Sequence, residues 1–246
     1  MTNQAAIIIP ARLSSTRLHQ KLLRTVMGKS VLEYTYMQAI KSGLNVVIAV
    51  DSDELYTHAL RFTNDVLMTP ATLQSGTERL AYVVKEGLVD ADIVVNWQAD
   101  EPLLSHTVVN NMVGILLNSH NTIATASTSF LTQEEWLSPN HVKVLIDKHQ
   151  RACYFSRAPI PYGADPLSCE MSQVIRKHIG MYAFKKEFLM DLFSISSCPL
   201  EKAEKLEQLS WLYAGHAMKV VDVPMYDGVG IDTQADLDRF AKMVCA

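Results

Sequence analysis

The sequence predicts an α/β fold with a doubly wound, mostly parallel sheet. Short apolar runs such as AAIIIP (5–10) and NVVIAV (45–50) alternate with segments whose apolar residues recur at helical spacing. Continuous apolar strands are typical of sheets covered on both faces, and the intervening helices supply that cover. Because 246 residues suffice to bury a large core, this alternation favours a parallel sheet between two helical layers.

The first half of the chain supports this prediction element by element. The segment 29–43 has helical spacing, and Gly43 stands where that helix would end. The next helix is expected after Asp51 and Ser52, because such side chains commonly cap helix N-termini. SGTER (75–79) is a further helix start, capped by Ser75 or Thr77. The remaining elements expected here are strands at 65–69 and 91–97 and a helix at 105–119.

After about residue 120 the apolar runs are interrupted by polar residues. The pattern of apolar and polar residues in this part of the chain predicts an extended segment at 151–166, one helix over 198–215 and a final helix capped by Thr233. The strands expected here are 121–130, 141–148, 174–186 and 217–224. We therefore predict one domain over 1–246, in which 1–120 and 216–246 form the core and 121–215 form an inserted, smaller mixed-sheet subdomain.

Composition excludes several classes of protein. The net charge of −4 provides no basic field that would recruit nucleic acid. The apolar stretches are strand-sized, shorter than the roughly 20 residues of a membrane span, and the N-terminus has no signal-peptide pattern. The four cysteines show neither zinc-site spacing nor a disulfide framework. We expect a cytoplasmic protein with reduced thiols and no membrane partner.

We expect the binding and catalytic residues where strands end, because ligands of open α/β sheets bind at the carboxyl ends of the strands. The first strand runs into Ala11 and Arg12, and a loop rich in hydroxyl and basic residues follows. That loop contains Ser14, Ser15, Thr16, Arg17 and Lys21. Neither G-x-G-x-x-G nor the P-loop motif is present, so a Rossmann dehydrogenase and a P-loop kinase are both poor interpretations.

Two further strand ends carry carboxylates. Asp100 follows the apolar run in VNWQADEP, and Asp232 precedes the last helix in DGVGIDTQAD. Strand-end carboxylates commonly hold Mg²⁺ together with substrate phosphates. The local alternatives are a turn residue before Pro102 for Asp100, and a turn or cap residue for Asp232. Folding alone could bring the two together, because 132 positions separate them.

Four polar residues of the second half are ambiguous when taken singly. Arg157 fits a surface ion pair as well as a binding site, and His178 fits a strand histidine whose hydrogen bonds are satisfied. Glu207 and Gln208 fit a solvent-exposed helix face.

Together, these segments resemble the 3-deoxy-manno-octulosonate cytidylyltransferase family over essentially the whole chain. The N-terminal PAR…STR…K pattern is shared with many nucleotide-sugar transferases, whereas SGTER, Q-x-D-E-P, YFSR and LEQL together are typical of this family. The segments that carry the resemblance are IIIPARLSSTRLHQKLL, SGTERLA, VNWQADEP, PNHVKV, YFSRAPIP, KHIGMYAF, PLEKAEKLEQL and GVGIDTQADL. The resemblance implies a nucleotide-sugar transferase-like fold and transfer of CMP from CTP to 3-deoxy-manno-octulosonate (Kdo) for lipopolysaccharide synthesis, with release of pyrophosphate.

The resemblance also implies roles for individual residues. Arg12 and Lys21 would bind the triphosphate, and Asp100 and Asp232 would hold Mg²⁺; these four would form the catalytic set. The cytidine triphosphate site would comprise Ala11, Arg12, Lys21, Ser75, Arg79 and Gln98. Arg157 would pair with the sugar carboxylate, because a guanidinium fork fits a carboxylate. The sugar site would be completed by His178, Tyr182, Glu207 and Gln208.

The chain departs from the family pattern in three places. Gln20 and Ala99 stand where P-G-K-P and Q-G-D have glycine, and the segment after YFSRAPIP is shorter and different. These departures leave open a related acidic sugar, such as 8-amino-Kdo or a sialic-acid-like nonulosonate. A non-catalytic nucleotide-sugar sensor is the alternative from another class, although both metal carboxylates are present. The family usually forms homodimers through the inserted region, so a homodimer is expected.

Overall fold

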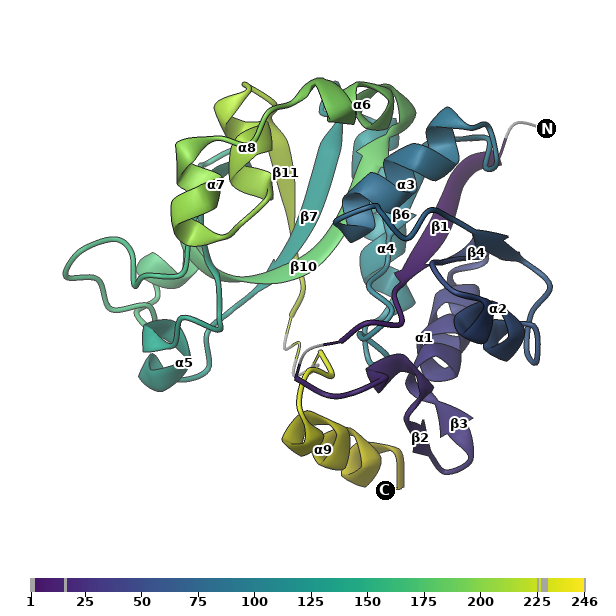
Figure 1. Cartoon of the computed structure of the whole chain (residues 1–246). Helices are drawn as coiled ribbons and strands as arrows, with labels where there is room; N and C mark the ends of the chain where they lie inside the picture. The colour runs from purple at the N-terminus through teal and green to yellow at the C-terminus, as the bar shows by residue number, and fades with distance from the viewer. Residues whose placement is uncertain (1–2, 16, 225, 227–229, 246) are drawn as a thin grey trace. The chain divides into compact units, whose positions relative to one another are not determined.

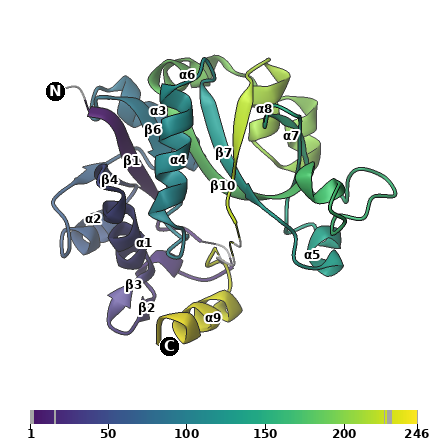
Figure 2. The same cartoon turned by 180° about the vertical axis from the view of Figure 1, so that it is seen from behind.

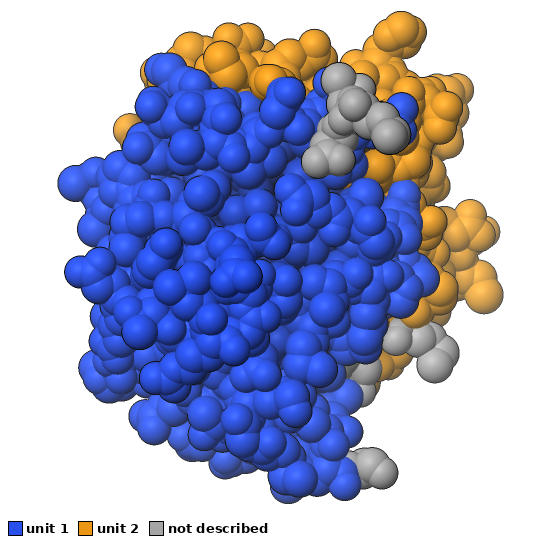
Figure 3. All heavy atoms as spheres, turned by 90° about the vertical axis from the view of Figure 1, so that its right-hand side faces the viewer, with its two compact units in different colours: residues 1–110, 227–246 blue, residues 111–226 orange. Residues whose placement is uncertain are grey.

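The computed structural model describes residues 3–15, 17–224, 226 and 230–245. The chain divides into two compact units, residues 1–110 with 227–246 and residues 111–226 (Figures 1 and 3). The sequence pattern predicts divisions near 120 and 216 instead. The difference at the second division arises because β11 (Met218–Asp222), assigned above to the core, pairs with a strand of the second unit.

The first unit is built on four parallel strands in the order β6-β1-β4-β5. In the central strand, Ile7, Ile8 and Ile9 have no exposed surface, which agrees with the prediction of strands covered on both faces. The strands are β1 (Asn3–Ala11), β4 (Asn45–Val50), β5 (Val66–Met68) and β6 (Ala91–Asn96). A short ribbon of β2 (Thr25–Val26) and β3 (Lys29–Ser30) lies beyond η1 (Lys21–Leu23).

The helices of the first unit begin at side-chain caps. The hydroxyls of Ser52, Ser75 and Thr233 accept backbone N–H bonds at the starts of α2, α3 and α9, as their sequences predict. Helix α3 lies across β1 and β6 (Figure 1). The helices are α1 (Val31–Ala39), which continues as η2 (Ile40–Ser42), α2 (Asp53–Ala59), α3 (Gly76–Lys85) and α9 (Gln234–Cys245), while α4 (His106–Leu117) spans the division at residue 110.

The second unit contains a mixed sheet, as predicted. β7 (Ile123–Thr128) runs parallel to β11 and antiparallel to β10 (Ile175–Lys185), and β7 and β11 lie side by side in Figures 1 and 2. β10 also pairs antiparallel with β8 (Lys143–Ile146), which pairs with β9 (Ala152–Ser156). The short helices of this unit are α5 (Gln133–Leu137), η3 (Met171–Gln173), α6 (Lys186–Asp191), η4 (Leu192–Ser194), α7 (Pro199–Glu204) and α8 (Gln208–Tyr213).

The prediction of one helix over 198–215 is wrong. Lys205 adopts a left-handed conformation with φ of 55°, which ends α7 before α8 begins. No glycine or proline marks this break, so helical spacing alone could not reveal it.

Cys153, Cys169, Cys198 and Cys245 are free cysteines, of which Cys198 is buried. Among the described residues, no helix is both long enough and apolar enough to cross a membrane.

Candidate active site

A pocket of about 340 Å³ opens in the first unit, where β1 and β6 end. Its position agrees with the rule that α/β sheets bind ligands at the carboxyl ends of their strands. Its walls are Pro10, Arg12, Ser14, Ser15, Arg17, Leu18, Lys21, Leu22, Gly76, Gln98, Ala99, Asp100 and Asp232. The structure thus gathers Arg12, Lys21, Gln98 and both candidate metal carboxylates around one cavity.

Lys21 lies between the two carboxylates. Its Nζ donates to Asp100 Oδ2 at 2.5 Å and to Asp232 Oδ1 at 2.8 Å, and Arg17 Nη2 donates to Asp232 Oδ2 at 2.7 Å. Burial by itself would lower the pKa of Lys21, but the charges and hydrogen bonds of Asp100 and Asp232 outweigh it and raise that pKa. The ammonium therefore stays charged and holds together two residues that are distant in the sequence.

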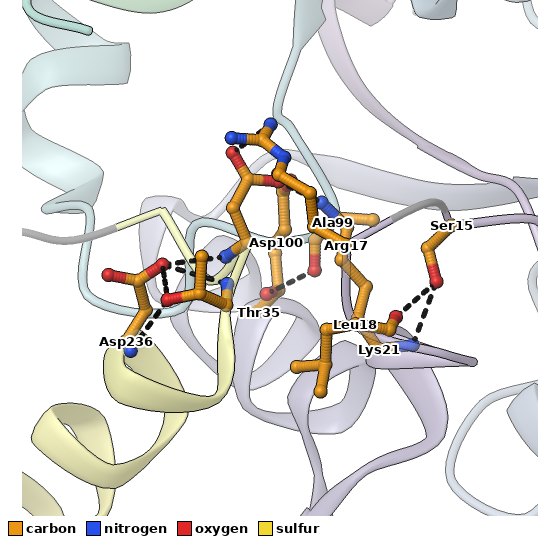
Figure 4. A network of polar contacts seen from close by, with 10 residues as sticks. Ser15, Arg17, Leu18, Lys21, Thr35, Ala99, Asp100 and Asp236 are labelled. Carbon is orange, nitrogen blue, oxygen red and sulfur yellow. Dashed lines mark hydrogen bonds and ion pairs between the residues drawn. The ribbon is translucent and has the colours of Figure 1, made fainter.

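The loop that follows β1 is organised by its own hydrogen bonds. Ser15 Oγ donates to the carbonyl of Leu18 and accepts a bond from the backbone N–H of Lys21 at 3.3 Å (Figure 4). The backbone N–H of Leu13 donates to Asp51 Oδ1 at 2.9 Å, which ties the loop to the end of β4. These bonds present Lys21 without the glycines of a P-loop. Thr16, noted in the sequence, lies outside the described residues.

Gln20, which replaces the family glycine, adopts φ 48° and ψ 42°. The position therefore uses the left-handed conformation that glycine adopts at little cost. Gln20 Nε2 donates to the carboxylate oxygens of Glu54 at 3.1 and 3.3 Å, and these bonds partly compensate the strain.

The strand-end segment Gln98–Asp100 is held from several sides. Thr35 Oγ1 donates to the carbonyl of Ala99 at 2.8 Å (Figure 4), and the backbone N–H of Ile231 donates to the carbonyl of Asp100 at 2.9 Å. Ala99 is buried and does not have a positive φ, so alanine fits here without backbone strain. The second of these bonds connects the Asp100 and Asp232 segments through their backbone as well.

The remaining residues expected at the nucleotide site have structural partners of their own. Ser75 caps α3, and Ala11 is fully buried in β1. Arg79 is also fully buried: its Nη1 donates to Thr69 Oγ1, and its Nη2 lies 3.9 Å from Asp51 Oδ2. Burial lowers the pKa of Arg79, although the charge of Asp51 opposes that effect. None of these three side chains belongs to the pocket wall described above.

Arg17, Ser14 and Gly76 are among the residues of this wall for which no ligand role was expected from the sequence. Arg17 forms an ion pair with Asp232, and Ser14, a residue of the loop after β1, lines the pocket. Gly76 is closely packed, because a Cβ there would lie 3.1 Å from Pro10 Cγ. A glycine at the first position of a capped helix is the one signal in the sequence that could have indicated this close approach.

The residues expected at the sugar site belong to the second unit. The rings of His178 and Tyr182 on β10 have centroids 5.5 Å apart, and Tyr182 packs edge-on against Trp211 of α8 at 5.2 Å. A register shift between Ile179 and Tyr182 interrupts the pairing of β10 with β7, and such bulges redirect side chains. Glu207 and Gln208 stand at the start of α8; Gln208 is buried and Glu207 is partly buried.

Burial decides the protonation of the aromatic pair. It lowers the pKa of His178 to about 3, so the ring is neutral at physiological pH. Burial, with a contribution from the charge of Glu207, raises the pKa of Tyr182 and keeps its hydroxyl protonated. The Thr125 hydroxyl donates to the carbonyl of Met181 at 2.8 Å, so His178 Nε2, 2.9 Å away, donates to Thr125 Oγ1. Nδ1 of His178 is then the hydrogen-bond acceptor.

Arg157 directly follows β9, and two nitrogens of its guanidinium group donate to backbone carbonyls. Its Nε donates to the carbonyl of Glu204 at 2.9 Å, and its Nη1 donates to the carbonyl of Pro139 at 3.0 Å. Within the part of the chain that the structure describes, no partner is recorded for Nη2. The end of the guanidinium thus keeps donors for an anion.

Comparison with known proteins shows the family to which this chain belongs. The cytidylyltransferase family model matches residues 6–220. The 3-deoxy-manno-octulosonate cytidylyltransferase of Pseudoalteromonas translucida (strain TAC 125) is 40% identical over 239 residues, which cover 95% of this chain and 94% of that protein. The chain belongs to the 3-deoxy-manno-octulosonate cytidylyltransferase family. It is therefore a nucleotidyltransferase.

Other members of this family and solved structures support the assignment. The 3-deoxy-manno-octulosonate cytidylyltransferase of Ruthia magnifica subsp. Calyptogena magnifica is 39% identical, with 96% of this chain and 98% of that protein covered. A structure of CMP:2-keto-3-deoxy-manno-octonic acid synthetase complexed with CTP matches with a TM-score of 0.90 at 30% identity and covers 98% of both chains. A 4-diphosphocytidyl-2C-methyl-D-erythritol synthase from Anaerococcus prevotii, 14% identical with a TM-score of 0.65, shares the fold and covers 98% of both chains.

Proposed function

We propose that this chain transfers CMP from CTP to the anomeric hydroxyl of Kdo, giving CMP-Kdo and pyrophosphate for lipopolysaccharide synthesis. The observation that carries this proposal is the pocket where β1 and β6 end, in which Lys21 joins Asp100 to Asp232. A triphosphate needs cations, and the reaction it undergoes needs positioning and charge stabilisation more than covalent chemistry.

The first unit supplies these groups. Arg12 and Lys21 line the pocket with side chains that can bind phosphate oxygens and stabilise the charge on the departing pyrophosphate. Gln98, on the same wall, is the polar group that we assign to the cytosine base. Arg12 Nη1 donates to the carbonyl of Gln74 at 2.6 Å, which fixes its position before the nucleotide enters.

The donor set of the pocket fits Mg²⁺. Asp100 and Asp232 bind the same ammonium, so their carboxylates are close enough to share one cation, and Mg²⁺ prefers one or two carboxylates with phosphates. When bound, Mg²⁺ would neutralise phosphate charge and lower the pKa of the attacking hydroxyl. Lys21, released from the carboxylates, would be free to contact the phosphates.

The second unit supplies groups for an acidic sugar. Arg157 offers a charged donor to a carboxylate, and neutral His178 offers Nδ1 as an acceptor for a sugar hydroxyl. Glu207 and Gln208 provide further acceptors and donors, and Tyr182 contributes a protonated hydroxyl. We assign the substrate class from this set, together with the names of the family members. We also propose a homodimer and a cytoplasmic location, in agreement with the family resemblance.

The test is CTP-dependent release of pyrophosphate with Kdo, 8-amino-Kdo and a sialic-acid-like nonulosonate, each with Mg²⁺ or with excess chelator. We expect the highest kcat/KM with Kdo and no release with chelator. A preference for either analogue would reassign the sugar. Failure to release pyrophosphate with any acidic sugar, while CTP still binds, would favour the non-catalytic sensor and overturn the proposal.

A further inference from the structure

A lysine of the second unit, unused in the proposed mechanism, has no exposed surface. Lys143 on β8 is 0% exposed, and its Nζ donates to the carbonyls of Ser138 at 2.7 Å and Arg157 at 2.9 Å. Burial lowers the pKa of Lys143, the charge of Arg157 adds to that effect, and the charge of Glu204 opposes it. Lysine is almost never fully buried unless it is paired. The contacts of this ammonium must therefore offset the free-energy cost of removing its charge from water.

Glu204, at the end of α7, binds the same segment from another side. Its Oε1 accepts a bond from Ser156 Oγ at 2.6 Å, and its Oε2 accepts one from the backbone N–H of Arg157 at 2.8 Å. Its own carbonyl accepts the bond from Arg157 Nε. Lys143 and Glu204 therefore hold the backbone N–H, the backbone carbonyl and the Nε of Arg157.

Glu204 also connects Arg157 to the other candidate sugar ligands. The left-handed residue Lys205 follows Glu204 directly, and Glu207, the N-cap of α8, and Gln208, its first residue, lie three and four positions after Glu204. The contacts of Glu204 thus join the end of β9 to the end of α7, from which a short turn leads to α8. A displacement of Arg157 would change its position relative to Glu207 and Gln208.

We propose that Lys143 is a positioning residue for the sugar site, which acts through the carbonyl of Arg157 and, with Glu204, fixes the guanidinium for an acidic sugar's carboxylate. This inference rests on the proposed function of Arg157. An apolar side chain of similar length would leave the carbonyls of Ser138 and Arg157 without their charged donor, and unpaired buried carbonyls destabilise the local geometry. A purely structural lysine would support folding without selecting among substrates.

The test compares Lys143→Met with Lys202→Met, an exposed lysine of α7, in steady-state assays that vary Kdo and CTP separately. For Lys143→Met we expect KM for Kdo to rise roughly tenfold or more while KM for CTP changes less than about twofold, because small displacements of a binding group weaken only its own ligand. Lys202→Met should match the wild type. Equal changes for both substrates, or none for Kdo, would overturn the proposal.

A double-mutant cycle with Arg157→Ala separates positioning from general stability. If Lys143 acts through Arg157, Lys143→Met has no further effect on KM for Kdo in the Arg157→Ala background; additive effects would contradict the proposal. Should Lys143→Met fail to fold, Glu204→Gln tests the same arrangement, and an unchanged KM for Kdo would count against it. Absence of turnover in the wild type with every acidic sugar would instead refute the proposed function.

Discussion

Lys21 Nζ lies 2.5 Å from Asp100 Oδ2, and the same ammonium lies 2.8 Å from Asp232 Oδ1. A cation of the protein thus occupies the point where the two carboxylates converge. One positive charge prevents two neighbouring carboxylates from repelling each other. A metal ion at the same point would have to replace Lys21, so the nucleotide and the metal are expected to bind in a coupled manner.

Asp100→Ala should leave a folded protein that forms almost no CMP-Kdo. The carboxylate that would hold Mg²⁺ is lost, and removing such a charge-stabilising group costs roughly 100-fold or more in kcat. The measurement is pyrophosphate release, with circular dichroism to confirm folding. Asp92→Asn, an exposed aspartate on the same strand, is the matched control and should be fully active. Wild-type turnover by Asp100→Ala would refute the metal assignment.

Lys21→Met should increase the affinity for a divalent cation in the absence of nucleotide. The two carboxylates then lose the counterion that they share, and only Asp232 keeps a cationic partner, Arg17, so Mn²⁺ should bind roughly tenfold more tightly or more, by electron paramagnetic resonance titration. CTP affinity should fall in the same variant. Lys242→Met on α9, which is exposed, should leave both affinities unchanged. Unaltered Mn²⁺ affinity in Lys21→Met would show that the ammonium does not compete with the metal.

Gln20→Gly should stabilise the protein. The left-handed conformation of Gln20 costs about 1 kcal/mol, whereas glycine adopts it freely, and the lost contact with Glu54 is exposed and weak. For a chain of this size the gain corresponds to an increase in Tm of about 2–4 °C. Gln20→Ala keeps the strain and loses the contact, so its Tm should not increase. A lower Tm for Gln20→Gly would mean that the Glu54 contact outweighs the strain.

Gly76→Ala should weaken CTP binding. The new Cβ would lie 3.1 Å from Pro10 Cγ, so the Pro10 ring or the start of α3 must shift by a few tenths of an ångström, and Pro10 and Gly76 both line the pocket. We expect KM for CTP to rise roughly fivefold, with a smaller change in KM for Kdo. Gly114→Ala in α4 is the matched control: apart from its chain neighbours and the nearby backbone of the helix itself, nothing lies within 4 Å of its Cβ position, so it should be neutral or stabilising. An unchanged KM for CTP would show that the pocket wall tolerates the displacement.

His178 should make stability fall in acid. Its pKa in the folded protein is about 3, below the ordinary 6.5, so the unfolded chain binds a proton that the folded protein does not. The free energy of unfolding should therefore fall by about 1–2 kcal/mol between pH 7 and pH 5 on account of this group. Urea unfolding of His178→Asn should lack that part of the slope. An identical pH dependence in both proteins would show that His178 titrates normally.

Local chemistry explains why some elements could be predicted. Ser52, Ser75 and Thr233 cap helices by accepting bonds from backbone N–H groups three residues later in the chain. The continuous apolar run of β1 indicates that this strand is buried on both faces, as it is in the structure. The break at Lys205 could not be predicted, because the left-handed residue is neither glycine nor asparagine. For the same reason, the strain at Gln20 was visible only as a departure from the family pattern.

The sequence by itself determined the alternation of strands and helices, the helix caps and the candidate residues at the strand ends, because each depends on neighbours in the chain. The tertiary structure decided that Lys21 joins Asp100 to Asp232, and that Arg79 is buried beside Asp51. It also decided that Lys143 is buried and donates to the backbone carbonyl of Arg157. These relationships depend on through-space distances and on the loss of solvent, which no spacing within the sequence encodes.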